Sequence, residues 1–264
     1  MIELKSFTKC YKNFAAVKNV SFIAPDNCVT ALVGLNGAGK TTILKAISAM
    51  HYADIGSVLV NGIEVSESPI KVKRMCSFVT EQPHLYDNYT VSELLETEIK
   101  LDDTIPLSAI RAKKSIENRV FKILKKFSLT TVSGKKTKEL SKGFKQRLSF
   151  ACAFCSDPSV FLLDEPMSGL DPQQIIEMRK LIKDLSKNKT VLFSTHNMHE
   201  VEEICSLAII LKEGEVVKIG APSKICLETK SKTFEEAFMK LTVESHNEII
   251  KKGPHKSVRS PYES

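Results

Sequence analysis

The sequence predicts an α/β fold: a parallel sheet at the core, an antiparallel β subdomain at the N-terminus and an inserted helical subdomain. Hydrophobic runs typical of strands alternate with amphipathic helical segments, as in sheets built from βα units. A glycine-rich loop, residues 34–41, connects one such strand to a helix. The segment from about 85 to 156 has helical periodicity and interrupts the alternation.

The N-terminal residues predict the antiparallel subdomain. Residues 1–28 alternate polar and apolar side chains in two runs, as strands joined by a turn do. Asn61-Gly62 lies between two further strand-like runs and is typical of a β-hairpin. Residues 77–80 predict another short strand.

The glycine-rich loop fits the phosphate-binding pattern G-x-x-x-x-G-K-[ST], with a buried strand expected at 29–33 and a helix at 42–50. Glycines let the backbone wrap a phosphate without a Cβ clash, and free N–H groups at a helix start hold negative charge. Lys40 is expected to reach the β- and γ-phosphates, and the Thr41 hydroxyl to ligate Mg²⁺. The motif therefore predicts a P-loop NTPase core. The predicted nucleotide-binding residues of the loop are Gly34, Asn36, Gly37, Ala38, Gly39, Lys40, Thr41 and Thr42.

A second candidate site is the acidic pair Asp164-Glu165, which follows the buried run 160–163. A carboxylate at a strand end beside the phosphate loop can hold the water shell of Mg²⁺, so Asp164 is a predicted metal ligand. Glu165 is expected to polarise the attacking water as a base. The alternative is a strand that ends in two solvated acids, which the phosphate loop disfavours. Strands at 190–193 and 207–210, with helices between, complete the expected sheet.

The helical subdomain is expected to begin at Thr90, a predicted N-cap with Glu93 three residues later. Apolar residues then recur at helical spacing, and a second helix face follows between 116 and 127. Residues 101–108 are expected to form the loop between these helices.

Composition narrows the class of function. A chain of 264 residues is one large domain, or a domain with a subdomain and a tail. It has no long apolar run and no signal-peptide pattern, so we expect a cytosolic chain without a membrane span. The net charge of +7 is mixed with acidic and apolar residues and few aromatics. This favours a solvated basic face, near anionic lipid headgroups, over a nucleic-acid groove.

The seven cysteines form no dense, even framework, so we expect reduced, buried thiols. Cys152 and Cys155 make a C-x-x-C pair in an apolar, helix-like run without a second Cys/His pair nearby. We therefore favour two core-facing helix residues over a zinc or redox site.

In order and approximate spacing, these motifs resemble the nucleotide-binding subunit of an ATP-binding cassette (ABC) transporter, over residues 1–220. Leu-Ser-Lys-Gly-Phe at 140–144 occupies the place of the LSGGQ signature of that family. Pro-Met-Ser-Gly-Leu-Asp-Pro at 166–172 matches the D-loop, and Ser-Thr-His at 194–196 matches the switch histidine. Tyr11 occupies the position of the aromatic ring that stacks on adenine, although ordinary strand packing is the alternative.

The resemblance implies a head-to-tail dimer with ATP sandwiched between the subunits. Ser141 and the Gly143 amide would donate to the γ-phosphate of the ATP held by the opposite subunit. Asp171 would link the two sites across the interface. His196 would hydrogen-bond the γ-phosphate and help to place the water, and Tyr11 would stack on adenine.

The sequence departs from the family pattern in two places. The signature has Lys142 in place of a glycine and Phe144 in place of the glutamine. This form is similar to the signatures of the family branch that pairs with ABC-2-type permeases. At the Q-loop, Glu81 takes the usual glutamine position and Gln82 is its neighbour. Either side chain could contact Mg²⁺ or the water.

The resemblance also implies partners. A separate permease is expected to contact residues 85–89, where Tyr86 and Tyr89 suit an interface; a plain surface loop is the alternative. The second ATP-binding subunit would be another copy or a different chain. The implied function is ATP hydrolysis at the cytoplasmic face of the cell membrane, which powers export through a permease. The alternatives are a soluble ABC-type ATPase acting on nucleic acid or ribosomes, and an ATP sensor that does not hydrolyse. No nucleic-acid partner is expected.

The chain beyond 220 is expected to be an extension, residues 221–264. It resembles the short terminal helix of ABC-2-type ATPases at about 233–242 and ends in a basic segment, 251–256, for which we expect disorder.

Overall fold

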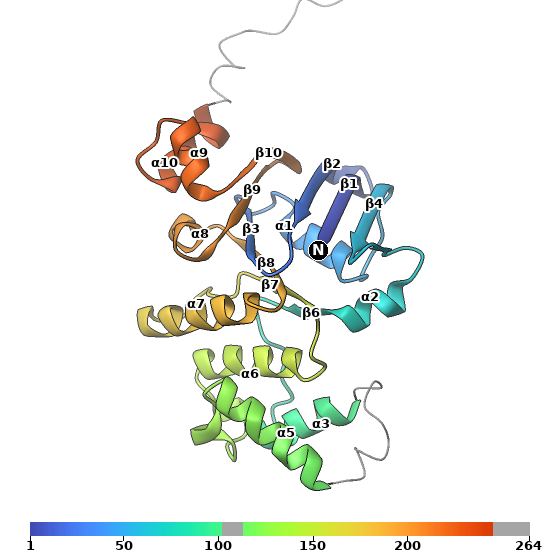
Figure 1. Ribbon diagram of the computed structural model, residues 1–264, viewed down its shortest axis with the longest axis vertical. Helices are drawn as coiled ribbons and strands as arrows, with labels where there is room; N and C mark the ends of the chain where they lie inside the picture. Colours follow the sequence, from blue (N-terminus) through green and yellow to red (C-terminus); the bar gives the residue numbers. More distant parts are fainter. Residues whose placement is uncertain (102–112, 245–264) are drawn as a thin grey trace, which may run out of the picture.

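The computed structural model describes residues 1–101 and 113–244, and Figure 1 shows their arrangement. The loop expected at 101–108 is wrong at Leu101, which ends the helix Val91–Leu101, and its remaining residues lie outside the described part. The expected disordered end at 251–256 also lies outside the described residues. The structure consists of an antiparallel sheet, a mainly parallel sheet and a helical subdomain. This architecture confirms the predicted fold class. No helix within the described part is long and apolar enough to cross a membrane.

The N-terminal sheet is antiparallel, with strand order β2-β1-β4-β5. Its hairpin turn at Asn61 and Gly62 forms as predicted, because both residues adopt positive φ, 50° and 76°, which a type I′ turn requires. The strands are β1 (Ile2–Tyr11), β2 (Phe14–Ala24), β4 (Ile55–Val60) and β5 (Ile63–Glu64).

The central sheet has the order β10-β9-β3-β8-β7-β6. All its pairs are parallel except β10 with β9, and this antiparallel edge strand is one that the sequence analysis did not anticipate. Because β3, β8 and β7 are adjacent and parallel, their carboxyl ends meet at one edge of the sheet, where ligands bind in such folds. The strands are β3 (Val29–Val33), β6 (Cys76–Val79), β7 (Val160–Asp164), β8 (Thr190–Thr195), β9 (Leu207–Lys212) and β10 (Glu215–Gly220).

The helices beside the sheet pack through apolar faces. Ile43, Leu44 and Ile47 of α1 are fully buried between the two sheets, in the core cluster that also holds Leu32 and Leu162. The helices are α1 (Lys40–Ile47), α2 (Pro69–Met75), α7 (Pro172–Ser186) and α8 (Met198–Ile204).

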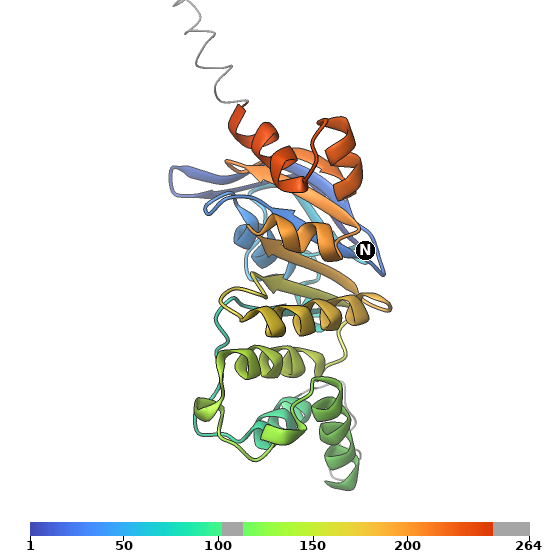
Figure 2. The same ribbon diagram turned by 90° about the vertical axis from the view of Figure 1, so that its left-hand side faces the viewer.

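The helical subdomain comprises α3 (Val91–Leu101), α5 (Lys113–Lys126) and α6 (Lys142–Phe154). The predicted cap forms: Thr90 Oγ1 accepts from the Glu93 N–H at 3.2 Å, and the Glu93 carboxylate accepts from the Thr90 N–H at 2.8 Å. In both views α6 lies beside α7, which joins the subdomain to the sheet (Figure 2). Short 3₁₀ turns occur at Thr130–Val132 and Thr137–Glu139.

The cysteines are free thiols. Cys155 is buried and Cys152 packs against the same core, so the core-facing interpretation of the C-x-x-C pair is confirmed. The expectation of buried thiols holds fully only for Cys155. Cys10 is exposed because it lies near the end of β1, and the other five cysteines are partly buried.

The C-terminal segment folds onto the outer side of β9, β10 and α8 (Figure 2). The expected helix is present as α10 (Phe234–Met239), followed by a π-helical turn (Lys240–Glu244). Phe234 and Phe238 of α10 are buried, which anchors it. A second helix, α9 (Pro222–Glu228), was not anticipated by the sequence analysis.

Candidate active site

The glycine-rich loop lies between β3 and α1, as predicted, at the carboxyl edge of the sheet. Gly37 and Gly39 adopt φ of 83° and 98°, a region that disfavours side chains. A Cβ at Gly39 would also lie 2.8 Å from the Ala16 carbonyl oxygen, so β2 packs directly against the loop. The loop therefore presents backbone N–H groups at the start of α1.

Lys40 is held at the centre of the loop. Its ammonium donates to the Gly34 carbonyl at 2.8 Å and to the Leu35 carbonyl at 3.3 Å, and its side chain is buried. The same Nζ lies 3.4 Å from Glu165 Oε1. A buried ammonium needs such partners, and these partners aim it at the space that the loop encloses.

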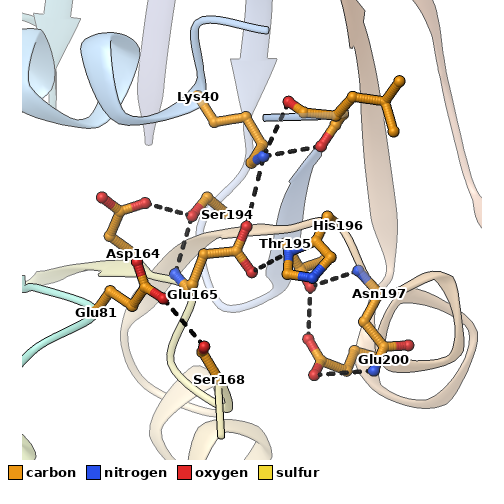
Figure 3. Close-up of polar contacts among 12 residues, drawn as sticks. Lys40, Glu81, Asp164, Glu165, Ser168, Ser194, Thr195, His196, Asn197 and Glu200 are labelled. Carbon is orange, nitrogen blue, oxygen red and sulfur yellow. Dashed lines mark hydrogen bonds and ion pairs between the residues drawn. The ribbon is translucent and has the colours of Figure 1, made fainter. Parts of the chain in front are cut away.

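Asp164 and Thr41 meet at the end of β7. The Thr41 hydroxyl lies 2.9 Å and 3.1 Å from the two carboxylate oxygens of Asp164, although the residues are 123 apart in the chain. Ser194 of β8 donates to Asp164 Oδ1 at 2.6 Å (Figure 3). The register of β7 with β8 places Asp164 opposite Ser194, so the sheet itself creates this contact.

Glu165 follows the strand in a strained conformation. Its φ of 46° lies in the left-handed region, which is uncommon for a residue with a side chain and marks many functional sites. The Glu165 N–H donates to Ser194 Oγ at 3.0 Å, and Glu165 Oε2 lies 3.0 Å from His196 Nδ1 (Figure 3). Glu165 therefore lies between Lys40 and His196, with one carboxylate oxygen toward each.

Glu200 holds the loop that carries His196 in place. The Thr195 hydroxyl donates to Glu200 Oε2 at 2.7 Å, and the Asn197 amide donates to Oε1 at 3.4 Å. Burial raises the pKa of the Glu200 carboxyl above its ordinary value. His196 itself is exposed, so its imidazole is free to meet a ligand while its backbone is held in place.

Lys40, Thr41, Asp164 and Glu165 line an open cleft with a volume of about 320 Å³, whereas Ser194, His196 and Glu200 are not part of its lining. Tyr11 and Phe14 form one wall and are both exposed, and the Tyr11 ring packs edge-on against His51 at 6.1 Å between centroids. Glu81 also lines the cleft and accepts a hydrogen bond from Ser168 at 3.0 Å. The full lining is Tyr11, Phe14, Ala16, Asn36, Gly37, Ala38, Gly39, Lys40, Thr41, Thr42, Glu81, Asp164 and Glu165.

Between the two Q-loop candidates, the structure brings Glu81 to the cleft. Gln82 is not part of the lining; its carbonyl accepts a hydrogen bond from the Thr80 hydroxyl at 2.8 Å.

The chemistry of the donor set fits a magnesium ion. Mg²⁺ takes oxygen ligands and is commonly held by one or two protein oxygens together with substrate phosphates and waters. The Thr41 hydroxyl and the Asp164 carboxylate supply such oxygens side by side, directly beside the phosphate loop. Among the described residues no cluster of three or more His, Cys, Asp or Glu side chains could hold a metal by itself.

Comparison with known proteins identifies the family. The family described as ABC transporter matches residues 17–168, more than half of the chain. The ABC-type transporter ATP-binding protein EcsA of Bacillus subtilis is 31% identical over 250 residues, which cover 92% of this chain and 97% of EcsA. The chain belongs to the ABC transporter family.

Further relatives agree. The sulfate/thiosulfate import ATP-binding protein CysA of Mannheimia succiniciproducens is 30% identical over 226 residues, 85% of this chain and 62% of CysA. A solved dimeric ATP-binding cassette, MJ0796 in a post-hydrolysis state with ADP and Pi, superposes with a TM-score of 0.75. It is 27% identical and covers 84% of this chain and 98% of its own. As an ATP-binding protein of this family, the chain is an ATPase.

The remaining ABC motifs lie on the α6–α7 side of the molecule, outside the cleft lining. Ser141 caps α6, accepting from the Phe144 N–H at 3.4 Å, and Asp171 caps α7, accepting from the Gln174 N–H at 2.9 Å. Gly143 is buried against the Gln174 side chain. The structure therefore brings Lys40, Thr41, Asp164, Glu165 and His196 together, whereas Ser141, Gly143 and Asp171 are not part of the lining of this cleft.

Sequence reasoning missed several residues of this ABC site, among them Ser194, Glu200, Phe14 and Ala16. Ser194 is brought to the site by the register of β7 with β8, and Glu200 is brought there by the position of α8. Neither arrangement can be read from the local sequence. Phe14 could have been noticed, because it is an aromatic residue three positions after Tyr11 in a strand pair.

Proposed function

We propose that this chain is the ATP-hydrolysing subunit of an ABC transporter and that it powers a separate membrane permease. The observation that carries the proposal is the single connected cluster of Lys40, Thr41, Asp164, Glu165 and His196 at the phosphate loop. This cluster contains a phosphate-binding cation, a magnesium-binding pair and a carboxylate–imidazole pair, which together suffice for attack of water on a terminal phosphate.

ATP binds with its phosphates on the loop and its adenine against Tyr11. Lys40 exchanges its contacts with Glu165 and the loop carbonyls for the β- and γ-phosphates, which leaves Glu165 free to accept a proton from water. His196, fixed through the Glu200 contacts, donates to the γ-phosphate. Thr41 and Asp164, with Glu81 nearby, hold Mg²⁺, which neutralises charge on the phosphates when bound.

Two ATP-binding subunits close head to tail over ATP. The position of Ser141, Gly143 and Asp171 away from their own cleft supports this arrangement, because these groups are then available to the ATP of the opposite subunit. The second subunit is a copy of this chain or a different ATP-binding chain. Closure on ATP and reopening after hydrolysis transmit work because ATP binds the closed dimer better than the open one.

The permease is a separate chain of the ABC-2 type, and the transport direction is export. The form of the signature, Leu-Ser-Lys-Gly-Phe, supports this branch. The exposed Tyr86 and Tyr89, with ring centroids 5.6 Å apart, suit contact with that permease. The chain then resides at the cytoplasmic face of the cell membrane.

Glu165→Gln tests the proposal, because the amide cannot accept a proton. We expect ATP turnover to fall by about 10²-fold or more, with ATP still bound and the dimer trapped. Glu67→Gln, at an exposed position that is not part of the cleft lining, is the matched control and should keep full turnover. Turnover is measured by phosphate release and dimerisation by size exclusion with ATP. Unchanged hydrolysis in Glu165→Gln would contradict the assignment of the base.

The transporter assignment is tested by purifying tagged Glu165→Gln from detergent-solubilised membranes with ATP. A co-purifying multi-span membrane protein is the expected result. Recovery only from the soluble fraction, together with ribosomes or DNA-bound proteins, would replace the transporter proposal with a soluble ABC-type ATPase.

A further inference from the structure

A partly buried histidine lies next to the Tyr11 wall of the nucleotide cleft. His51 belongs to the segment between α1 and β4, and its imidazole packs edge-on against the Tyr11 ring. The angle between the two ring planes is 89°. His51 is not part of the cleft lining, so any effect that it has on a bound nucleotide passes through residues that are.

Both ring nitrogens of His51 are buried. Among the residues that the structure describes, neither Nδ1 nor Nε2 has a hydrogen-bond partner. Burial lowers the pKa of His51, and the nearby Lys9 and Lys45 lower it further. Asp54 and the Thr42 backbone oppose this shift but do not outweigh it. The ring is therefore uncharged at neutral pH, and it contributes packing rather than an ion pair or a hydrogen bond.

His51 lies between two parts of the cleft that ATP must span. On one side is Tyr11, the last residue of β1. On the other side is the backbone of Thr42, in the first turn of α1 and directly after the phosphate-loop motif. Tyr11 and Thr42 both line the cleft. The packing of His51 therefore helps to set how the Tyr11 ring lies relative to the phosphate loop.

The end of β1 is tied to the same segment of chain. The Asp54 carboxylate accepts from the Cys10 N–H at 2.7 Å and from the Lys9 ammonium at 2.8 Å. These bonds hold the backbone as far as residue 10. The Tyr11 side chain beyond it is 47% exposed, and its ring contact within the described part of the chain is with His51. The direction of the Tyr11 ring thus depends on the histidine.

We propose that His51 is a positioning residue for ATP binding, whose ring holds Tyr11 in place to stack on adenine. The inference rests on the proposed function, which puts adenine against Tyr11, and adds the residue that supports this contact. A side chain that is held in place before the ligand arrives loses less conformational freedom on binding, so the affinity is higher. Because the support comes from ring packing, phenylalanine at position 51 should replace histidine, whereas alanine should not.

The test measures the binding of ATP and of tripolyphosphate, which lacks the adenosine, to the full chain by calorimetry with Mg²⁺. The variants are His51→Ala, His51→Phe and the control Tyr52→Ala, which removes the ring of an exposed neighbour outside the cleft lining. We expect His51→Ala to weaken ATP binding about three- to tenfold, as loss of an aromatic pair does, and to leave tripolyphosphate binding unchanged. His51→Phe and Tyr52→Ala should bind both ligands as the wild type does.

Coupling to Tyr11 separates positioning from general damage to the fold. In the Tyr11→Ala background, His51→Ala should not weaken ATP binding further, because the ring through which His51 acts is already absent. Thermal unfolding checks that each variant is folded. His51→Leu fills much of the same space without a ring, so it should also weaken ATP binding, and it carries the test if His51→Ala does not fold.

The outcomes distinguish this inference from the proposed function. The positioning role is overturned by equal ATP affinity of wild type and His51→Ala, by equal losses of ATP and tripolyphosphate binding, or by additive losses in the double variant. The adenine position still stands in those cases if Tyr11→Ala alone weakens ATP binding. If Tyr11→Ala leaves ATP binding unchanged, the adenine position in the proposed function is refuted, and this inference with it.

Discussion

Ser194→Ala is the most informative single change at the active site, because one buried hydroxyl supports both the Asp164 carboxylate and the Glu165 backbone. Ser194 is fully buried, donates to Asp164 at 2.6 Å and accepts from the Glu165 N–H at 3.0 Å. Alanine removes both bonds without creating a sizeable cavity.

The magnitude follows from these two bonds. A buried N–H left unsatisfied costs about 1–3 kcal/mol, and a hydrogen bond to a charged group contributes about 1.5–3 kcal/mol. Because one hydroxyl makes both bonds, the terms are not additive, and we expect the free energy of unfolding to fall by about 2–4 kcal/mol. Glu165 also loses a contact that holds its left-handed backbone, so kcat should fall at least about tenfold, equivalent to about 1.4 kcal/mol.

The assays are urea unfolding and steady-state phosphate release at saturating ATP and Mg²⁺. Ser186→Ala is the matched control, since its hydroxyl makes one bond, 2.9 Å to the Lys183 carbonyl at the end of α7. That change should alter stability by no more than about 0.5 kcal/mol and leave kcat intact. Ser194→Ala with wild-type stability and kcat would refute the reasoning.

Further changes probe other parts of the site. Lys40→Ala should abolish ATP binding measured by calorimetry, and retained tight binding would contradict the assigned site. Tyr11→Ala should weaken ATP binding about 5- to 100-fold, as loss of base stacking does, whereas Tyr11→Phe should bind normally; equal affinities would favour simple strand packing. Burial raises the pKa of Glu200 above 4.5, so the folded chain retains a proton that the unfolded chain releases, and stability falls as pH rises through this window. Glu200→Gln should therefore gain stability relative to wild type from pH 4.5 toward neutrality in urea titrations; a constant difference would count against it.

The features that the sequence predicted depend on neighbouring residues. The strand, loop and helix around Lys40 follow from local hydrophobic periodicity and glycine spacing, and the Thr90–Glu93 cap follows from a three-residue interval. The turn at Asn61-Gly62 is likewise set by two residues with positive φ. In each case the short segment already contains the physical cause of its structure.

The features that escaped prediction depend on contacts between distant segments. Ser194 lies opposite Asp164 because β7 and β8 are paired in that register, which no local pattern specifies. β10 was missed because its residues alternate between exposed and partly buried positions at the sheet edge, so it lacks the apolar run of a central strand. The choice of Glu81 over Gln82 required the folded structure, in which the Ser168 hydroxyl donates a hydrogen bond to the Glu81 carboxylate.

The unusual signature connects to the D-loop within one subunit. The Lys142 Nζ lies against Gly169, whose φ of 66° and lack of a side chain leave room for it. Gly143 is packed against Gln174, which in turn completes the capping box with Asp171 at the start of α7. A Cβ at 143 or at 169 would displace the end of the Gln174 or the Lys142 side chain, so glycine at these two positions preserves the observed contacts, and the positive φ at 169 favours glycine in addition. Lys142 and the D-loop therefore form one continuous surface. A second ATP-binding subunit would contact the signature and the D-loop together.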